Sequence, residues 1–245
     1  MLYSEKFQVR WHDTDATREV RPSEVLAYMQ ETANHQFRRH AVSLDELRDT
    51  QGVGFILSRI AVDFLTPMHA YEEITVQTAT CAGHGLTFPR RFEVLRDGTV
   101  TARAMSQWAM VRVADRTLLR AQEAPLCFGD EPEIVTQMPL RFRVPRELRF
   151  EAVGERRVAY SDLDYNMHMN NTHYPDMICD FLEEMTDGEN GWRVAAMSLS
   201  YIKESHLGAT LTVTRSERAE DGTVYIRTLN EAGETCLEAV VKLEK

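Results

Sequence analysis

The sequence lacks the features that mark secreted, zinc-binding and membrane-spanning chains. Its four cysteines lie far apart and form no CxxC pair, which argues against a zinc site or a disulfide scaffold and favours a reducing compartment. No apolar run approaches the roughly 20 residues that a membrane helix needs. The N-terminal stretch MLYSEKFQVRWHD has no apolar core of the secretory type, so we expect a cytoplasmic protein without a membrane span.

Positive charge is also scarce. The 28 Lys and Arg residues are outnumbered by 38 Asp and Glu residues, and the resulting net charge of −10 argues against a general nucleic-acid-binding protein. We find no glycine-rich loop that would cradle a phosphate and no His/Cys cluster with ligand spacing, so we expect no cofactor and no metal. The 245 residues, 43% of them hydrophobic, suffice for one large domain or two small ones with a proper core.

What the sequence does contain is an internal repeat. WHDTDATREVRPSEVLAYMQETANHQ (residues 11–36) corresponds to YSDLDYNMHMNNTHYPDMICDFLEEM (residues 160–185), at an offset of 149 positions. In both segments apolar residues recur at helical spacing after a polar stretch. A proline, Pro22 or Pro175, stands early in each pattern, where a helix tolerates it. We therefore expect one long helix in each half of the chain.

Segments with strand character follow each helical pattern. Polar and apolar residues alternate clearly in TLTVTRSE and TVYIRTL, as is typical of half-buried antiparallel strands. A sheet curled around one long helix would bury the apolar face of both. The expected strands lie within residues 55–65, 72–82, 87–98 and 99–113 of the first half, and 194–205, 209–222, 223–234 and 235–245 of the second.

A proline-rich stretch without any clear period separates the two halves and reads as a linker. A long connection suits two similar units that dock side by side. The predicted fold class is α+β, a tandem (double) hotdog with two long central helices, each wrapped by an antiparallel sheet. Its predicted parts are an N-terminal hotdog (residues 1–128), a linker (residues 129–150) and a C-terminal hotdog (residues 151–245).

The polar stretch before the helix differs between the halves, although the helical pattern behind it does not. If these side chains only capped a helix or shaped a turn, both halves would manage with similar residues. We therefore expect the second half to carry the chemistry and the first to be catalytically degenerate. The residues peculiar to the second half are Asn166, His168, Asn170, Asn171 and Glu204, where the first half has Thr17, Glu19, Arg21, Pro22 and Pro67.

This stretch resembles a known signature. Residues 164–171 read D-x-N-x-H-x-N-N, as in the acyl-carrier-protein thioesterases of bacteria and plant plastids, and Tyr174 follows. LSYIKESHLGATLTV, which contains Glu204, and ILSRIAVDFLTPM resemble further segments of that family, so the likeness spans almost the whole chain. One departure is Ser205, where plant members commonly have a cysteine.

The resemblance implies a double-hotdog hydrolase that releases free fatty acid from acyl carrier protein in fatty acid biosynthesis. The family's catalytic set falls on Asp164, Asn166, His168 and Glu204. Glu204 or His168 could accept the proton of the attacking water. We favour Glu204, with His168 and Asn166 holding the thioester and Asp164 orienting an imidazole or amide.

The asparagines in front of the helix allow two interpretations. Backbone N–H groups near Asn170 and Asn171, at the helix N-terminus, would stabilise an oxyanion. The same side chains suit a simple cap or turn. We expect Asp162 to shape the end of the leading strand, and Cys179 and Cys236 to be packing residues.

Substrate and partner can be placed only by resemblance. The acyl chain would bind mainly in the first half, with Leu26, Met29, Phe55, Leu57 and Phe64 as candidate contacts. Acyl carrier protein is acidic, so an acidic enzyme needs a local basic patch to dock it. The candidate docking residues are Arg141, Arg143, Arg146 and Arg149, followed by the pairs Arg156-Arg157 and Arg90-Arg91. The alternative is that these arginines pair with the many surface carboxylates.

The sequence leaves several alternatives open. An acyl-CoA thioesterase would use the same fold and much the same site, because coenzyme A carries the same phosphopantetheine arm. A non-catalytic protein that binds acyl groups or acyl carrier protein is a further alternative, against which the intact polar set counts. Two hotdog units within one chain are compatible with a monomer and with a homodimer. The length of the acyl chain is not given by the sequence.

Overall fold

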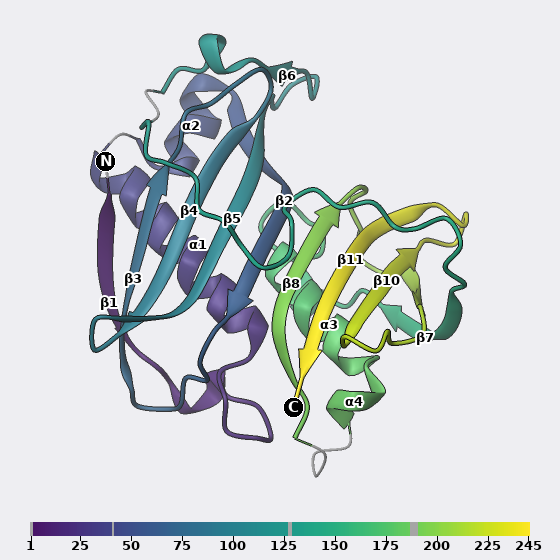
Figure 1. The fold of residues 1–245 in the computed structure, drawn as a ribbon. Coiled ribbons are helices and arrows are strands. Elements are labelled where there is room, and N and C mark those ends of the chain that lie inside the picture. The colour runs from purple at the N-terminus through teal and green to yellow at the C-terminus, as the bar shows by residue number, and fades with distance from the viewer. Residues whose placement is uncertain (1, 41, 127–128, 187–190) are drawn as a thin grey trace.

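The computed structural model describes residues 2–40, 42–126, 129–186 and 191–245. Across these residues the named strands join in one antiparallel sheet with helices on one of its faces (Figure 1). The strand order is β1-β3-β4-β5-β2-β8-β11-β10-β9-β7, and the short β6 pairs with β5. The large antiparallel sheet and the few helices agree with the predicted α+β class.

The first half of the chain contributes six strands and two helices. Its leading strand precedes the long helix, and the remaining strands follow it, in the order that the sequence predicts. The strands are β1 (Tyr3–Gln8), β2 (Val53–Phe64), β3 (Glu73–Thr80), β4 (Phe88–Arg96), β5 (Thr99–Arg112) and β6 (Leu118–Leu119); the helices are α1 (Pro22–His40) and α2 (Leu44–Gln51).

The second half contributes five strands and shorter helices. Short 3-10 turns also occur in both halves, at Trp11–Asp13, Ala121–Glu123, Tyr160–Asp162 and Asn171–His173. No helix of the described residues is long and apolar enough to cross a membrane. The strands are β7 (Glu151–Arg157), β8 (Arg193–Tyr201), β9 (Thr210–Arg215), β10 (Thr223–Leu229) and β11 (Thr235–Glu244); the helices are α3 (Tyr174–Asp180) and α4 (Glu183–Thr186).

The two halves of the sheet have the same strand order when each is read inward from its outer edge. β1-β3-β4-β5-β2 corresponds to β7-β9-β10-β11-β8. The halves meet where β2 pairs with β8, from Arg59 opposite Ser200 to Asp63 opposite Ala196. The sequence repeat is therefore also a structural repeat. The junction also pairs two strands whose backbone groups would otherwise form exposed sheet edges.

The expectation of two long central helices is wrong for the second half. α1 has 19 residues, whereas α3 has 7 and ends at Phe181, whose φ of −111° and ψ of 12° leave the helical region. The Phe181 ring lies against Gly154 of β7, where an added Cβ would be 2.4 Å from Cε1. Phe181 and Met185 still pack against the core on either side of the break. The helical spacing of apolar residues in the sequence therefore continues through the break and gives no sign of it.

Helix α2 was not among the elements that the sequence analysis predicted. Ser43 caps its N-terminus by accepting a hydrogen bond from the Glu46 N–H (3.1 Å), and Gly52 ends it with a left-handed φ of 64°. Ser43 followed by Glu46 and then Gly52 is a recognised start-and-stop pattern, so a signal for this helix was present in the sequence.

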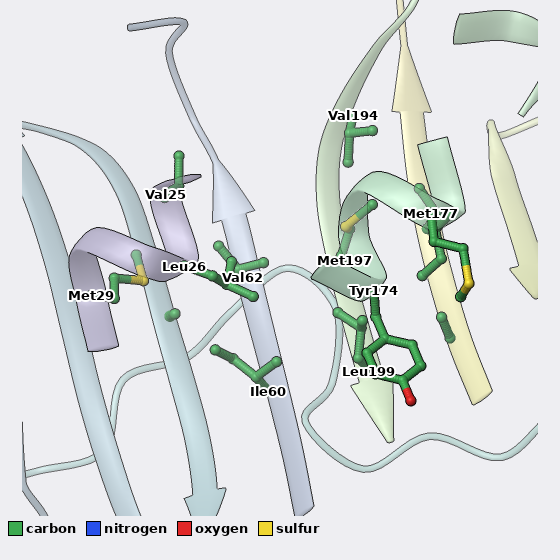
Figure 2. Close-up of a cluster of buried hydrophobic side chains, with 14 of the residues drawn as sticks. Val25, Leu26, Met29, Ile60, Val62, Tyr174, Met177, Val194, Met197 and Leu199 are labelled. Atoms are coloured by element: carbon green, nitrogen blue, oxygen red, sulfur yellow. The ribbon is translucent and has the colours of Figure 1, made fainter. Parts of the chain in front are cut away.

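The core lies between the helices and the inner face of the sheet, in both halves (Figure 2). Leu26 and Met29 of α1 are fully buried on the side of the junction where β2 carries Ile60 and Val62. The second half repeats this arrangement. There Tyr174 and Met177 of α3 are buried, Tyr174 lies beside Leu199 of β8, and Val194 and Met197 of the same strand are buried as well.

The linker crosses the face of the sheet opposite to α1 (Figure 1). Residues 129–150 contain no named helix or strand. The Gln137 N–H donates to both carboxylate oxygens of the buried Asp63 (2.8 and 3.0 Å), and the Ser198 hydroxyl donates to the Pro139 carbonyl (2.9 Å). The linker is thus fastened to both sides of the junction. Cys127 and the unit boundary predicted at residue 128 lie outside the described residues.

Candidate active site

A tight turn holds the polar residues in front of α3. The Asp164 N–H donates to the His168 carbonyl (3.0 Å), and the Met167 N–H donates to the Asp164 carbonyl (3.0 Å). Met167 has a left-handed φ of 66°, and Leu163 pairs with Met169 across the turn. Because the chain reverses within these residues, the side chains of Asp164 and His168 lie beside each other.

His168 lies between two carboxylates. Its Nδ1 is 3.7 Å from Asp164 Oδ1, and its Nε2 is 3.7 Å from Glu204 Oε1. Both distances exceed that of a hydrogen bond, but catalytic contacts in a protein without substrate are often this long. Glu204 comes from the segment after β8, where His206 forms a β-bridge with His168. All three side chains are partly exposed, at 20% for Asp164, 23% for His168 and 29% for Glu204.

Asn166 completes the group that the sequence predicts. Its N–H donates to Asp164 Oδ1 (2.8 Å), and its Nδ2 donates weakly to Asp164 Oδ2 (3.4 Å). The structure therefore brings together Asp164, Asn166, His168 and Glu204, which we call the polar cluster.

Two arginines of the first half also contact the polar cluster. Arg116, in the turn between β5 and β6, donates to Glu204 Oε1 (2.5 Å), and Arg48 of α2 donates to Asn166 Oδ1 (3.1 Å). Neither residue belongs to a motif, and neither was predicted from the sequence. These contacts join residues 88 and 118 positions apart, so no local signal predicts them.

The two asparagines before α3 have structural roles. Asn170 is an N-cap: its Oδ1 accepts from the Thr172 N–H (3.0 Å), while its own N–H donates to the Asp162 carbonyl (2.8 Å). Two of the N–H groups expected to meet an oxyanion are thus engaged within the turn. Asn171 Oδ1 accepts from Nε2 of Gln30 in α1 (2.5 Å), which ties the front of α3 to the first half.

Asp162 shapes the strand end, as expected. Its Oδ2 accepts from the Ala159 N–H (2.8 Å) and its Oδ1 accepts from Arg156 (2.6 Å). Burial alone would raise the pKa of Asp162, but these bonds and the Arg156 charge outweigh it, so the pKa lies below its ordinary value. Arg156 is therefore engaged with a buried carboxylate, although it was a candidate docking residue.

Ser205, beside Glu204, is buried and does not resemble an activated nucleophile. Its hydroxyl accepts a hydrogen bond from the hydroxyl of Tyr174 (3.0 Å), and burial raises the pKa of Tyr174 to about 12. The buried pair braces the segment that carries Glu204. Burial also raises the pKa values of the Cys179 and Cys236 thiols, which agrees with the expected packing roles.

A pocket opens in the first half, between α1, the start of α2 and the sheet. Its wall is mainly apolar and aromatic. Of the residues predicted to contact an acyl chain, Phe55 lines this pocket. Leu26, Met29 and Leu57 are instead buried in the core, and Phe64 packs against it.

The four linker arginines predicted to dock acyl carrier protein are all exposed: Arg141, Arg143, Arg146 and Arg149. Arg141 donates through Nε and Nη2 to Gln107 Oε1 of β5 (3.2 and 2.9 Å). Within the described part of the chain, no hydrogen bond or ion pair joins the four to the polar cluster. Arg90, a further candidate, is 4% exposed, so its selection as a docking residue was wrong.

Solved structures with the same fold cover nearly the whole chain. An acyl-ACP thioesterase from Bacteroides thetaiotaomicron is 20% identical, with a TM-score of 0.87 over 99% of this chain and 98% of its own. A 12:0-ACP thioesterase from Umbellularia californica is 15% identical, with a TM-score of 0.81 over 99% and 97%. At these identities the likeness establishes the fold alone. A search of curated protein sequences finds no match.

Family models give the assignment that structural likeness cannot. The model of the acyl-ACP thioesterase N-terminal domain matches residues 1–124, and the model of the C-terminal domain of the same enzymes matches residues 148–245. The two models fall on the two halves of the repeat and leave residues 125–147 between them unmatched. The chain therefore belongs to the acyl-ACP thioesterase family.

Proposed function

We propose that the polar cluster is the place where this thioesterase hydrolyses its substrate. The enzyme cleaves the thioester of acyl-[acyl carrier protein] and releases free fatty acid and holo-acyl carrier protein in fatty acid biosynthesis. The observation that carries the location is the position of His168, with Asp164 on one side and Glu204 on the other. The acyl-CoA and non-catalytic alternatives have no comparable support.

In the proposed reaction, Glu204 takes a proton from a water molecule as the water oxygen attacks the thioester carbonyl carbon. The carbonyl oxygen becomes an oxyanion, which the Asn166 amide and His168 stabilise through N–H donors. When the carbon–sulfur bond breaks, the proton passes to the thiolate through His168. Arg116 holds the Glu204 carboxylate in place, and Asp164 orients the imidazole. The scheme requires no cofactor and no metal.

We also propose a division of labour between two hotdog units. Residues 1–128 form the unit that binds the acyl chain, residues 129–150 the linker, and residues 151–245 the unit with the catalytic residues. The mirrored strand order supports two tandem units of one architecture, of which only the first keeps a long central helix. The pocket beside α1 supports an acyl-binding role for the first unit, with Phe55 as the predicted contact that lines it.

The docking of acyl carrier protein remains a proposal that rests on charge. Arg141, Arg143, Arg146 and Arg149 give the acidic chain a local basic surface. We propose a cytoplasmic enzyme that acts as a monomer or a homodimer, because two units are already paired within one chain.

The location of the active site is tested by Glu204→Gln. Thiol release should be measured on acyl-carrier-protein thioesters from short to long chains, with matched acyl-CoAs. We expect a loss of about 10²- to 10⁴-fold in kcat with acyl-carrier binding retained, because the variant removes the proton acceptor. The control is Glu19→Gln, the same chemical change in the first-half turn that corresponds to Asp164–His168, because the position equivalent to Glu204 is Pro67. Full activity of Glu204→Gln would contradict the assignment.

The docking surface is tested by reversing Arg141, Arg143 and Arg146 to Glu together. The KM for an acyl-carrier-protein substrate should rise, while the KM for a short acyl thioester stays unchanged, because only the former uses the basic surface. Equal changes for both substrates would count against docking on the linker.

A further inference from the structure

Arg90 is a buried cation in the wall of the pocket. It lies on β4 with 4% of its surface exposed. Its Nη1 donates to Gln36 Oε1 (2.6 Å) and to the Thr78 hydroxyl (2.9 Å), and its guanidinium carbon lies 5.0 Å from the centre of the Phe37 ring. Burial lowers the pKa of Arg90 to about 10, so the group still carries its charge at neutral pH.

One side of the Arg90 guanidinium is left without a protein partner. Nη2 is buried and finds no hydrogen-bond acceptor among the residues that the structure describes. No carboxylate of the same residues forms an ion pair with Arg90. Leaving a buried charged donor unpaired costs more than leaving a neutral one, so such groups normally have partners. A ligand in the pocket would supply the missing acceptor.

The position of Arg90 indicates which part of a ligand it would meet. Gln30 and Phe37 both line the pocket from α1, seven residues or about 10 Å apart along the helix axis. Gln30 donates a hydrogen bond to Asn171, which precedes α3 in the catalytic half. The Arg90 guanidinium lies over the ring of Phe37. Across the sheet, Phe55 lines the pocket from β2, which pairs with β8 of the catalytic half, whereas Arg90 lies on β4, two strands farther away. Arg90 is therefore on the side of the pocket away from the junction. The wall between is mainly apolar and includes Leu44, Phe55 and Trp108.

We propose that this pocket takes an acyl chain with an oxygen function near the end remote from the thioester, and that Arg90 Nη2 donates a hydrogen bond to that oxygen. The oxygen belongs to a hydroxyl, keto or carboxylate group. This inference rests on the proposed function, because it assumes that the pocket holds the acyl chain. A methyl terminus would leave the buried donor unpaired, and sites with such donors discriminate strongly against ligands that lack the acceptor.

Binding of non-hydrolysable acyl-pantetheine amides tests the proposal without requiring catalysis. Three amides of equal chain length, ending in a methyl, a hydroxyl or a carboxylate group, are titrated calorimetrically against the wild type, Arg90→Met and Arg91→Met. We expect the wild type to prefer at least one oxygenated chain by about tenfold or more. Arg90→Met should lose the preference. Arg91→Met should keep it, because Arg91 is on the same strand but pairs with Glu93.

The outcomes separate this inference from the proposed function. The same three chains are presented as carrier-protein thioesters in the hydrolysis assay. Hydrolysis without any preference for oxygenated chains, or tightest binding of the methyl-ended amide by the wild type, overturns the role of Arg90 but leaves the thioesterase site intact. If the protein hydrolyses none of these substrates but still prefers the oxygenated amides, the proposed thioesterase site is contradicted while the role of Arg90 stands. If Arg90→Met does not fold, Arg90→Lys serves as the second variant, and the wild-type preference remains decisive by itself.

Discussion

The turn at Asp15–Glu19 and the turn at Asp164–His168 share one backbone and differ in their side chains. The Asp15 N–H donates to the Glu19 carbonyl (2.8 Å), as the Asp164 N–H does to the His168 carbonyl (3.0 Å). Arg18 and Met167, 149 positions apart, both have left-handed φ values, 69° and 66°. The shape of the turn is therefore not what distinguishes the two halves.

The difference lies in what each turn presents. In the first half Glu19 bridges to His69, whereas in the second His168 bridges to His206, so the two turns pair with equivalent segments that follow β2 and β8. Pro67 occupies the position of Glu204, so no carboxylate faces the first turn from that segment. The comparison shows that both halves have the same backbone arrangement around the turn. The proposed chemistry depends on a few side chains that are present in the second half alone.

The largest effect is expected from removing the imidazole. His168→Ala should lower kcat by about 10²- to 10⁴-fold, because the thioester loses a donor and the leaving thiolate loses its proton source. The corresponding change, Glu19→Ala, should leave kcat within a few-fold of the wild type. Both are measured by thiol release from acyl carrier protein. Comparable losses in the two variants would break the distinction between a catalytic and a supporting half.

A smaller effect, on stability, should be shared by both halves. Asp13 and Asp162 are corresponding buried carboxylates, and Asp13 accepts bonds from the Arg10 N–H (3.0 Å) and the Tyr28 hydroxyl. Burial raises the pKa of Asp13, but its hydrogen bonds bring the net pKa below the ordinary 3.8, as for Asp162. Asp13→Asn and Asp162→Asn should each lower the free energy of unfolding by about 2 kcal/mol at neutral pH.

The pH dependence of that loss follows from the direction of the pKa shift. A carboxylate with a lowered pKa in the folded state stabilises the fold above the unfolded value near 3.8 and loses this contribution as pH falls through the folded value. Urea unfolding at neutral pH and at about pH 3 should therefore show the variants converging on the wild type in acid. A loss at only one of the two positions would show that the repeat is not equivalent in its scaffold.

The smallest effect concerns the helix that differs between the halves. Gly154→Ala should destabilise the protein by about 1 kcal/mol or more, because the new Cβ would meet the Phe181 ring and force it to move. Its counterpart Glu5→Ala removes a partly exposed pair with His35 and a long hydrogen bond from the Tyr3 hydroxyl (3.5 Å), which should cost less than about 1 kcal/mol. Urea unfolding measures both. Recovery in Gly154→Ala/Phe181→Leu would identify the ring as the cause.

Much of the fold could be predicted because it is local and repeated. Each of the eight expected strand segments contains or overlaps one observed strand, since alternation reports directly on which face of a strand is buried; the short β6 was not expected. The break after α3 could not be seen in this way. Phe181 and Met185 keep the apolar period of one helix, and the space that Gly154 leaves for the ring is a contact between distant segments.

The residues of the candidate site could be predicted from the sequence only in part. Asp164 and His168 are near neighbours in the chain, so their meeting follows from one turn. Arg48 and Arg116 reach the cluster from the other half, which requires the way the halves pack to be known. Arg90 did have a signal: with a strand period of two it shares a face with Phe88 and Phe92, both buried. A charged residue predicted to lie on the buried face of a strand is a candidate for the wall of a pocket.

The junction of β2 and β8 also has a consequence for how this molecule can change. In an assembly of two identical chains, every substitution appears twice, so a pocket cannot be reshaped without altering the same position beside the reacting group. Here the two halves are separate stretches of one polypeptide, held together by strand pairing and by the linker. Residues around Arg90 can therefore be varied while His168 and Glu204 stay as they are. With the roles proposed above for these residues, selectivity and turnover would be independently adjustable traits.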